Sequence, residues 1–207
     1  MTDHSTPTPA ETGTGEIRPV TTVAELKALA DPLRLAILDA LTGGTSRQLR
    51  VLSVKELAAE LGEPKTKLYR HVKLLEAAGL IRVAATRLVS GIVEQRYQAC
   101  QIDLVAGPWS IREPGAADQA NAAVAATLDH YRRRFVGYLA SLPPGGPPSE
   151  GRSLLTTAGR TLSPARAQII KDKLQEILAE LDRPAGPGDD GDGTVQLELL
   201  VSYMTIG

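Results

Sequence analysis

The chain has 207 residues and a hydrophobic content of 43%, enough to bury a real core in one large domain or two small ones. No apolar run is long enough to cross a membrane, and the N-terminus lacks the basic start and apolar core of a signal peptide, so we expect a soluble, cytoplasmic protein. The net charge of −1 hides an asymmetry, because residues 20–100 carry 12 Lys+Arg against 8 Asp+Glu, whereas residues 101–207 carry 10 against 13.

The N-terminal part is expected to contain a tail and two helices. Residues 1–19 are rich in Thr, Pro, Glu and Gly and predict a disordered tail. Thr22 is placed to cap a first helix. Asp31 and Pro32 then fit the N-cap and the first turn of a second helix, which ends at Gly43-Gly44 because glycine adopts the left-handed conformation that closes helices. These two helices are expected to form a scaffold.

A helix-turn-helix pattern follows the second helix. Ser53 and Glu56 have the spacing of a capping box, in which each side chain accepts a hydrogen bond from the backbone of the other, so a helix should begin at Val54. Gly62 suits the end of that helix. Pro64 suits the first turn of the next one, where its missing N–H costs nothing.

The next helix has two contrasting faces. Leu68, Val72 and Leu75 recur at helical spacing and predict a buried face. Polar and basic residues occupy or flank the opposite face: Thr66, Lys67, Tyr69, Arg70 and Lys73. Such a helix has the chemistry to lie in a DNA groove, with cations on phosphates and forked donors on base edges. The alternative is an ordinary solvated helix, which charge alone favours.

A strand hairpin is predicted directly after this helix. Ile81 and Val83 alternate with polar or small residues, as in a half-buried strand, and Ser90-Gly91 marks a turn. Val93, Gln95 and Tyr97 alternate with polar residues on the returning strand. Two helices followed by such a hairpin predict a winged helix.

Four linked segments resemble the winged-helix transcriptional regulators of the ArsR type. They are ADPLRLAILDAL (Ala30 to Leu41), ELAAELG (Glu56 to Gly62), YRHVKLLEAAGLI (Tyr69 to Ile81) and the hairpin ending in EQRYQA. The resemblance implies a dimeric bacterial DNA-binding protein, often a repressor released by a ligand. The metal-sensing branch of that family carries thiolates where this chain has Ala58 and Ala59, so the resemblance points to the branch that does not sense metals.

A linker and a long helix are expected after the winged domain. Residues 101–115 contain Gly107-Pro108 and Pro114-Gly115 around Trp109 and predict the linker. Apolar residues then recur along a helix from Ala116 to Leu142 as a coiled-coil-like seam: Ala117, Ala120, Val124, Leu128, Tyr131, Phe135, Tyr138 and Leu142. The partner of this seam is either the same helix of a second subunit, which the resemblance favours, or the C-terminal segment of the same chain.

The remaining residues predict a small strand-helix-strand module. A loop at Pro143–Pro148 leads to a strand at Arg152 to Thr161 and a helix from Ser163-Pro164, and residues 195–206 form an apolar strand. We therefore expect an α+β chain with an N-terminal winged helix-turn-helix domain at 20–100. A dimerisation and effector-binding module is expected at 116–207, with the effector in a cleft between its sheet and helices.

These patterns favour a sequence-specific DNA-binding transcriptional regulator, and the resemblance implies a homodimeric repressor that responds to an unknown non-metal effector. The expected partners are double-stranded DNA, a second copy of the chain and a small molecule, with no membrane, metal or cofactor. Seven residues are expected to contact DNA: Thr66, Lys67, Tyr69 and Arg70 on bases, and Lys65, Lys73 and Arg87 on phosphate.

Two other classes of function compete with this reading. A winged-helix module for protein interaction, without specific DNA binding, is compatible with the modest charge of +4 that 12 basic and 8 acidic residues give to residues 20–100. An enzyme is not expected, because the sequence lacks a Ser-His-Asp set and a Gly-rich phosphate loop. Its three histidines, His4, His71 and His130, lie far apart in the sequence.

Overall fold

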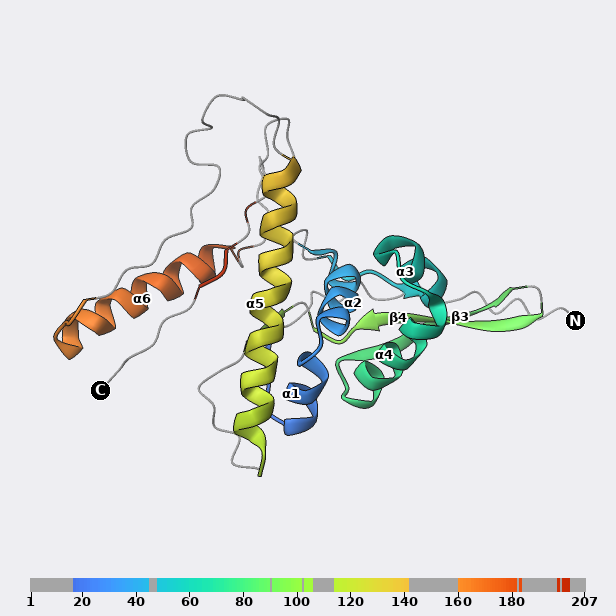
Figure 1. Ribbon diagram of the computed structural model, residues 1–207, viewed down its shortest axis with the longest axis horizontal. Helices are drawn as coiled ribbons and strands as arrows, with labels where there is room; N and C mark the ends of the chain where they lie inside the picture. The colour runs from blue at the N-terminus through green and yellow to red at the C-terminus, as the bar shows by residue number, and fades with distance from the viewer. Residues whose placement is uncertain are drawn as a thin grey trace, which may run out of the picture. The chain divides into compact units, whose positions relative to one another are not determined.

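The computed structural model of the chain describes residues 17–44, 48–89, 91–101, 103–105, 114–141, 160–181, 183, 197 and 199–201 (Figure 1). The chain divides into two compact units, Met1–Ala140 and Ser141–Gly207. The long helix that the sequence analysis groups with the C-terminal module therefore belongs almost entirely to the first unit. None of the helices in the described part is long and apolar enough to span a membrane.

Four helices begin where the sequence predicts, to within a residue: α1 (Val23–Leu29), α2 (Pro32–Thr42), α3 (Val54–Leu61) and α4 (Lys65–Ala77). Helices α2 and α3 also end at the predicted glycines. Thr22 caps α1, and Asp31 caps α2 by accepting hydrogen bonds from the N–H groups of Leu33 and Arg34 at 2.9 and 3.0 Å. Gly43 ends α2 with φ of 72°, a left-handed conformation that glycine adopts without strain. Local capping chemistry therefore defines the start of α1 and both ends of α2.

One hydrophobic core joins α1–α4 to the base of the hairpin. Its fully buried side chains come from every one of these elements: Leu26, Ile37, Leu41, Leu57, Leu68, Val72, Leu75, Leu80 and Tyr97. Each side chain of this size contributes about 1.5–3 kcal/mol when fully buried. Three of these residues, Leu68, Val72 and Leu75, belong to α4. The orientation of that helix is therefore set by packing against the core.

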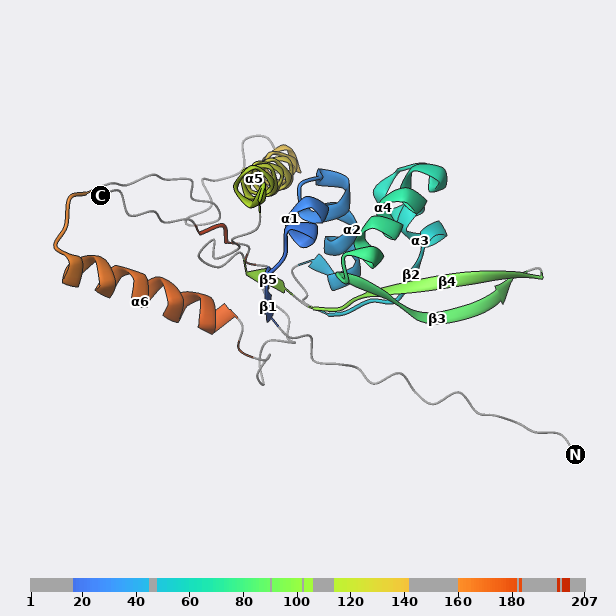
Figure 2. The ribbon, with the colours of Figure 1, turned by 90° about the horizontal axis from the view of Figure 1, so that it is seen from below.

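The hairpin consists of β3 (Ile81–Val89) and β4 (Ile92–Ala99), and the two-residue β2 (Leu52–Ser53) completes an antiparallel sheet in the order β2-β4-β3. Figure 2 shows the distal half of the hairpin extending beyond the helices as a wing. The predicted alternation of buried and exposed residues holds only on β3 near its base. On β4 it is wrong, because Tyr97, Gln98 and Ala99 are all buried, whereas Val93 and Gln95 are exposed. A bulge between Val83 and Ala85 breaks the register, and Ala85 is exposed rather than half-buried.

A short parallel strand pair corrects the expected tail and linker. β1 (Ile17–Pro19) lies within the stretch predicted as a tail, and it pairs with β5 (Asp103–Val105), which lies within the predicted linker (Figure 2). Arg18 in β1 donates a 2.6 Å hydrogen bond to the carboxylate of Glu25 in α1. Backbone pairing and this ion pair therefore fasten residues 17–19 to the winged domain.

Glu25 provides a pH-dependent contribution to stability. Burial would raise the pKa of this carboxyl, but hydrogen bonds from the N–H groups of Thr21 and Thr22 and from Arg18 hold the pKa below its ordinary value. A carboxyl whose pKa is lowered by folding stabilises the folded state at pH values above its unfolded-state pKa. This contribution is lost as the pH falls through the folded-state pKa.

We therefore expect Glu25→Gln to lower the free energy of unfolding at pH 7 by about 1–3 kcal/mol, because the amide loses the charged acceptor. Between about pH 5 and pH 3 the wild-type chain should lose stability more steeply than the variant. Urea unfolding across this range measures both slopes. Parallel slopes would contradict a stabilising role for the ionised carboxylate.

Helix α5 (Ala116–Ser141) packs a face of small residues on the winged domain. Ala120 and Ala123 belong to the hydrophobic core, and Arg134 donates two 2.7 Å hydrogen bonds to Asp39 of α2. Figures 1 and 2 both place α5 alongside α1 and α2. The predicted helix is confirmed over its described length, and Leu142 lies outside the described residues.

The second unit contributes α6 (Pro164–Leu181), as predicted. The two predicted strands are not present at their described positions, because Arg160, Thr161, residue 197 and residues 199–201 adopt neither helix nor strand. A pair of strands is marginal without a larger sheet, which is the physical weakness of that prediction. The other residues of both stretches, the loop at Pro143–Pro148 and Trp109 lie outside the described residues.

Candidate nucleic-acid interface

Helix α3 begins with reciprocal capping and ends at a glycine that leads into the turn before α4. Ser53 Oγ accepts from the N–H of Glu56 at 3.3 Å, and the Glu56 carboxylate accepts from the N–H of Ser53 at 2.7 Å. This backbone hydrogen bond lowers the pKa of Glu56. Gly62 ends α3 with φ of 65°, and α4 begins one residue after Pro64, which serves as the N-cap rather than lying in the first turn.

Loss of the Ser53 hydroxyl is expected to weaken the start of α3. Ser53→Ala should lower the free energy of unfolding by about 1 kcal/mol, because an N–H group at the start of α3 loses its acceptor. Lys55→Ala, at an exposed position on the same helix, is the control and should change stability little. Denaturant titrations compare the two. If both variants unfolded like the wild type, the capping box would contribute no stability.

Helix α4 turns one polar face outward. Leu68, Val72 and Leu75 are fully buried. Since successive residues are rotated by about 100° around a helix, the side chains opposite this buried face are those of Thr66, Arg70 and Lys73, and all three are exposed. The predicted two-faced helix is therefore present, with its polar face directed away from the core.

Four of the predicted contact residues are free to meet a ligand. Lys65, Thr66, Tyr69 and Arg70 are exposed, and their side chains make no hydrogen bond or ion pair with the described part of the chain. Pro64 offers no side chain to cap α4. The first N–H groups of α4, those of Lys65 and Thr66, therefore have no side-chain cap from Pro64, an arrangement that suits an anionic oxygen.

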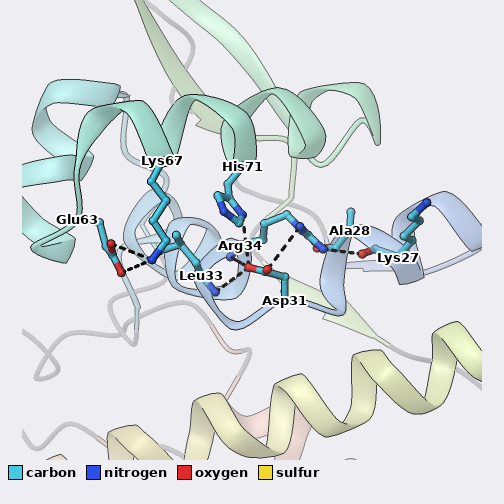
Figure 3. A network of polar contacts seen from close by, with 8 residues as sticks. All are labelled: Lys27, Ala28, Asp31, Leu33, Arg34, Glu63, Lys67 and His71. Atoms are coloured by element: carbon cyan, nitrogen blue, oxygen red, sulfur yellow. Dashed lines mark hydrogen bonds and ion pairs between the residues drawn. The ribbon is translucent and has the colours of Figure 1, made fainter.

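Lys67 and His71 lie along the side of α4 that faces the start of α2 (Figure 3). Lys67 Nζ donates to both carboxylate oxygens of Glu63 at 2.9 and 3.0 Å. The structure thus places Lys67 beside the outward face and pairs its charge within the chain. A base contact from Lys67 would require this pair to open, which costs little because exposed ion pairs contribute less than about 1 kcal/mol.

His71 joins α4 to the scaffold helices α1 and α2. Its mostly buried Nδ1 lies 3.4 Å from the carboxylate of Asp31, the residue that caps α2. Arg34 lies 3.7 Å from the same carboxylate and donates a 2.7 Å hydrogen bond to the carbonyl of Lys27 (Figure 3). This network links α4 to the junction of α1 and α2.

Lys73 is held toward the sheet. Its Nζ donates a 2.7 Å hydrogen bond to Glu76 and lies 5.9 Å from the ring centroid of Tyr97. The hydrogen bond to Glu76 raises the pKa of Lys73. The side chain is exposed, so the cation can exchange this carboxylate for a phosphate at little cost.

The wing carries one predicted contact residue and an unexpected apolar tip. Arg87 is exposed on β3, with Glu94 as its register partner on β4. Around the turn, the exposed fractions of Leu88, Ile92 and Val93 are 70%, 73% and 64%. The sequence signal for this tip is the group of apolar residues on both sides of Ser90-Gly91, where the alternation of a half-buried strand is lost.

The described residues contain no group of three or more His, Cys, Asp or Glu side chains that could hold a metal ion. Ala58 and Ala59 lie on α3, where side chains without donor atoms cannot coordinate a metal.

Comparison with known families identifies the same region. The family model described as a helix-turn-helix domain matches residues 29–84, from the end of α1 to the beginning of β3. No curated protein matches the chain. The chain therefore carries a helix-turn-helix domain within a mixed α and β structure, which suggests a DNA-binding regulator.

Proposed function

We propose that the chain is a sequence-specific DNA-binding transcriptional regulator of the ArsR type, in the branch that does not sense metals. The observation that carries this proposal is the outward face of α4, where Thr66 and Arg70 are exposed and have no partner among the residues that the structure describes, while three buried side chains fix the helix from behind. A rigid helix that presents polar donors in this way fits the major groove of DNA.

Each candidate residue has a role in this binding mode. Arg70 supplies a forked donor for a guanine edge, and Thr66 and Tyr69 read neighbouring bases. Lys65 and the first N–H groups of α4 hold one phosphate, and Lys73 holds another. Arg87 reaches a phosphate from the wing. Lys67 joins the base contacts once its pair with Glu63 opens.

The regulator is a homodimer assembled through α5. The alanine face of this helix is occupied by the winged domain, whereas larger apolar side chains on another face remain exposed, among them Val124, Leu128 and Leu139. Tyr131 and Phe135 stack at 6.2 Å between ring centroids along the same seam. An exposed apolar seam on a 26-residue helix supports pairing with a second copy.

We further propose that the dimer is a repressor whose DNA affinity changes when a non-metal small molecule binds. The repressor role and the effector come from the ArsR resemblance, and residues 116–207 are the proposed location of the effector site. No catalytic activity and no cofactor are proposed.

A protein-interaction module without specific DNA binding is the second candidate. The observation that favours it is the apolar wing tip, because exposed apolar patches mark protein contacts more often than phosphate contacts. This candidate predicts that the wing, and not α4, determines partner binding.

Selection of bound duplexes from a random DNA pool distinguishes the two candidates. The full chain should enrich an inverted repeat and bind it more tightly than random DNA at moderate salt. Leu88→Ser together with Ile92→Ser should leave this enrichment intact. Failure to bind any duplex at low salt would contradict the regulator and support the interaction module.

A further inference from the structure

Helix α6 carries a regular apolar seam of its own. Five residues recur at alternating spacings of three and four: Ala167, Ile170, Leu174, Ile177 and Leu181. None of the residues of α6 is buried, and the exposed fractions of Ile170 and Ile177 are 45% and 49%. This spacing is the a and d pattern of a two-stranded coiled coil, which buries such a seam against a second helix.

We propose that α6 is a self-association helix that pairs in antiparallel orientation with α6 of a second copy of this chain. In this register Ile170 packs against Leu181 of the second copy, and Leu174 packs against Ile177 of the second copy. By symmetry each layer occurs twice, so four apolar layers cover the seam between Ile170 and Leu181.

Charge complementarity selects this orientation. In the antiparallel register, Lys173 lies beside Glu180 of the second copy, and the two-fold symmetry gives two such opposite-charge pairs. A parallel pairing would instead place Arg166 beside Lys171 of the second copy, which is repulsive. Shifting the antiparallel register by one heptad would set Lys173 against Lys173 and Arg166 beside Glu180 of the second copy, and it would replace two of the four Ile–Leu layers with layers of Ala167 and Ile177. The charges therefore fit the antiparallel orientation, and the size of the apolar layers fits this register.

The charges needed for these pairs are accessible. Glu180 is exposed, and within the chain it contacts Arg183 at 2.7 Å through one carboxylate oxygen. Exposed pairs of this kind contribute less than about 1 kcal/mol, so Glu180 can accept a second cation from another copy. The proposal depends on α6 alone and is independent of DNA binding and of the α5 seam.

Disulfide trapping in the full chain tests the orientation. With Cys100→Ser as background, Ile170→Cys and Leu181→Cys chains are mixed and oxidised, one of them carrying a tag that changes its size. Antiparallel pairing predicts mixed disulfides, because residues 170 and 181 share a layer, whereas two copies of residue 170 are about 16 Å apart along the helix. Ala179→Cys, on the opposite face, is the control.

Charge reversal tests the register. Lys173→Glu in both chains should reduce the yield of mixed disulfide several-fold, and adding Glu180→Lys should restore it. Glu176→Lys, on the outer face, changes the charge as much as Glu180→Lys does and should leave the yield unchanged. Three results would each overturn the proposal. The first is disulfide formation only between two copies of the same variant. The second is a yield of mixed disulfide no higher than that with Ala179→Cys, and the third is a yield of mixed disulfide that Lys173→Glu does not change.

Discussion

Arg70→Ala is expected to weaken binding to the preferred DNA site by about 1–3 kcal/mol and to change binding to random DNA little. The guanidinium at this position is exposed and unpaired at the centre of the outward face of α4, so its forked donors are available for a base edge. Fluorescence anisotropy with the selected duplex and a scrambled duplex of equal length measures both affinities.

Two variants separate base reading from charge in this experiment. Arg70→Lys keeps the positive charge without the fork and should lose much of the same discrimination. Lys73→Ala should weaken binding to both duplexes and reduce the salt dependence by about one ion, as expected for a phosphate contact. Equal losses on both duplexes for Arg70→Ala would assign Arg70 to phosphate and leave α4 without its main base reader.

In chains that also carry Lys173→Glu to weaken the α6 pairing, Leu128→Glu is expected to convert the dimer into a monomer and to reduce the apparent DNA affinity by about 100-fold or more. The change places a carboxylate in the middle of the apolar seam of α5, where pairing would bury it. A monomer loses the gain of about 10²–10⁴ that two linked binding modules obtain on adjacent half-sites. Sedimentation and anisotropy on the same samples measure assembly and binding together.

The control for this change is Ala122→Glu, at an exposed position of α5 that belongs to neither the alanine face nor the seam. It should sediment and bind DNA like the wild type. A dimeric Leu128→Glu chain with wild-type affinity would show that another surface carries the pairing of the DNA-binding domains.

The features that the sequence predicts best are those that depend on neighbouring residues. The capping boxes at Thr22 and Ser53 and the left-handed glycines Gly43 and Gly62 define helix ends through contacts within a few residues, and they lie as expected. The buried back of α4 follows from helical spacing for the same reason. The helix-turn-helix domain is predictable from these local rules.

The sequence does not predict contacts between segments that are distant along the chain. β1 and β5 are three-residue strands whose pairing joins the two ends of the winged domain, and neither strand is long enough to show a period. The bulge beyond Val83 depends on how β3 pairs with β4. At the candidate site, the position of Lys73 near Tyr97 is likewise non-local, whereas the Lys67 pair with Glu63 follows helical spacing and is visible in the sequence.

Guanine-specific methylation protection on the selected duplex tests the central claim most directly, because it reports N7 atoms in the major groove, where α4 is proposed to lie. We expect two protected major-groove segments about one helical turn apart, both lost together with Leu128→Glu and each weakened at one guanine by Arg70→Ala. Guanine protection that is absent from a duplex that the chain binds would contradict the assignment of α4 as the DNA-reading helix.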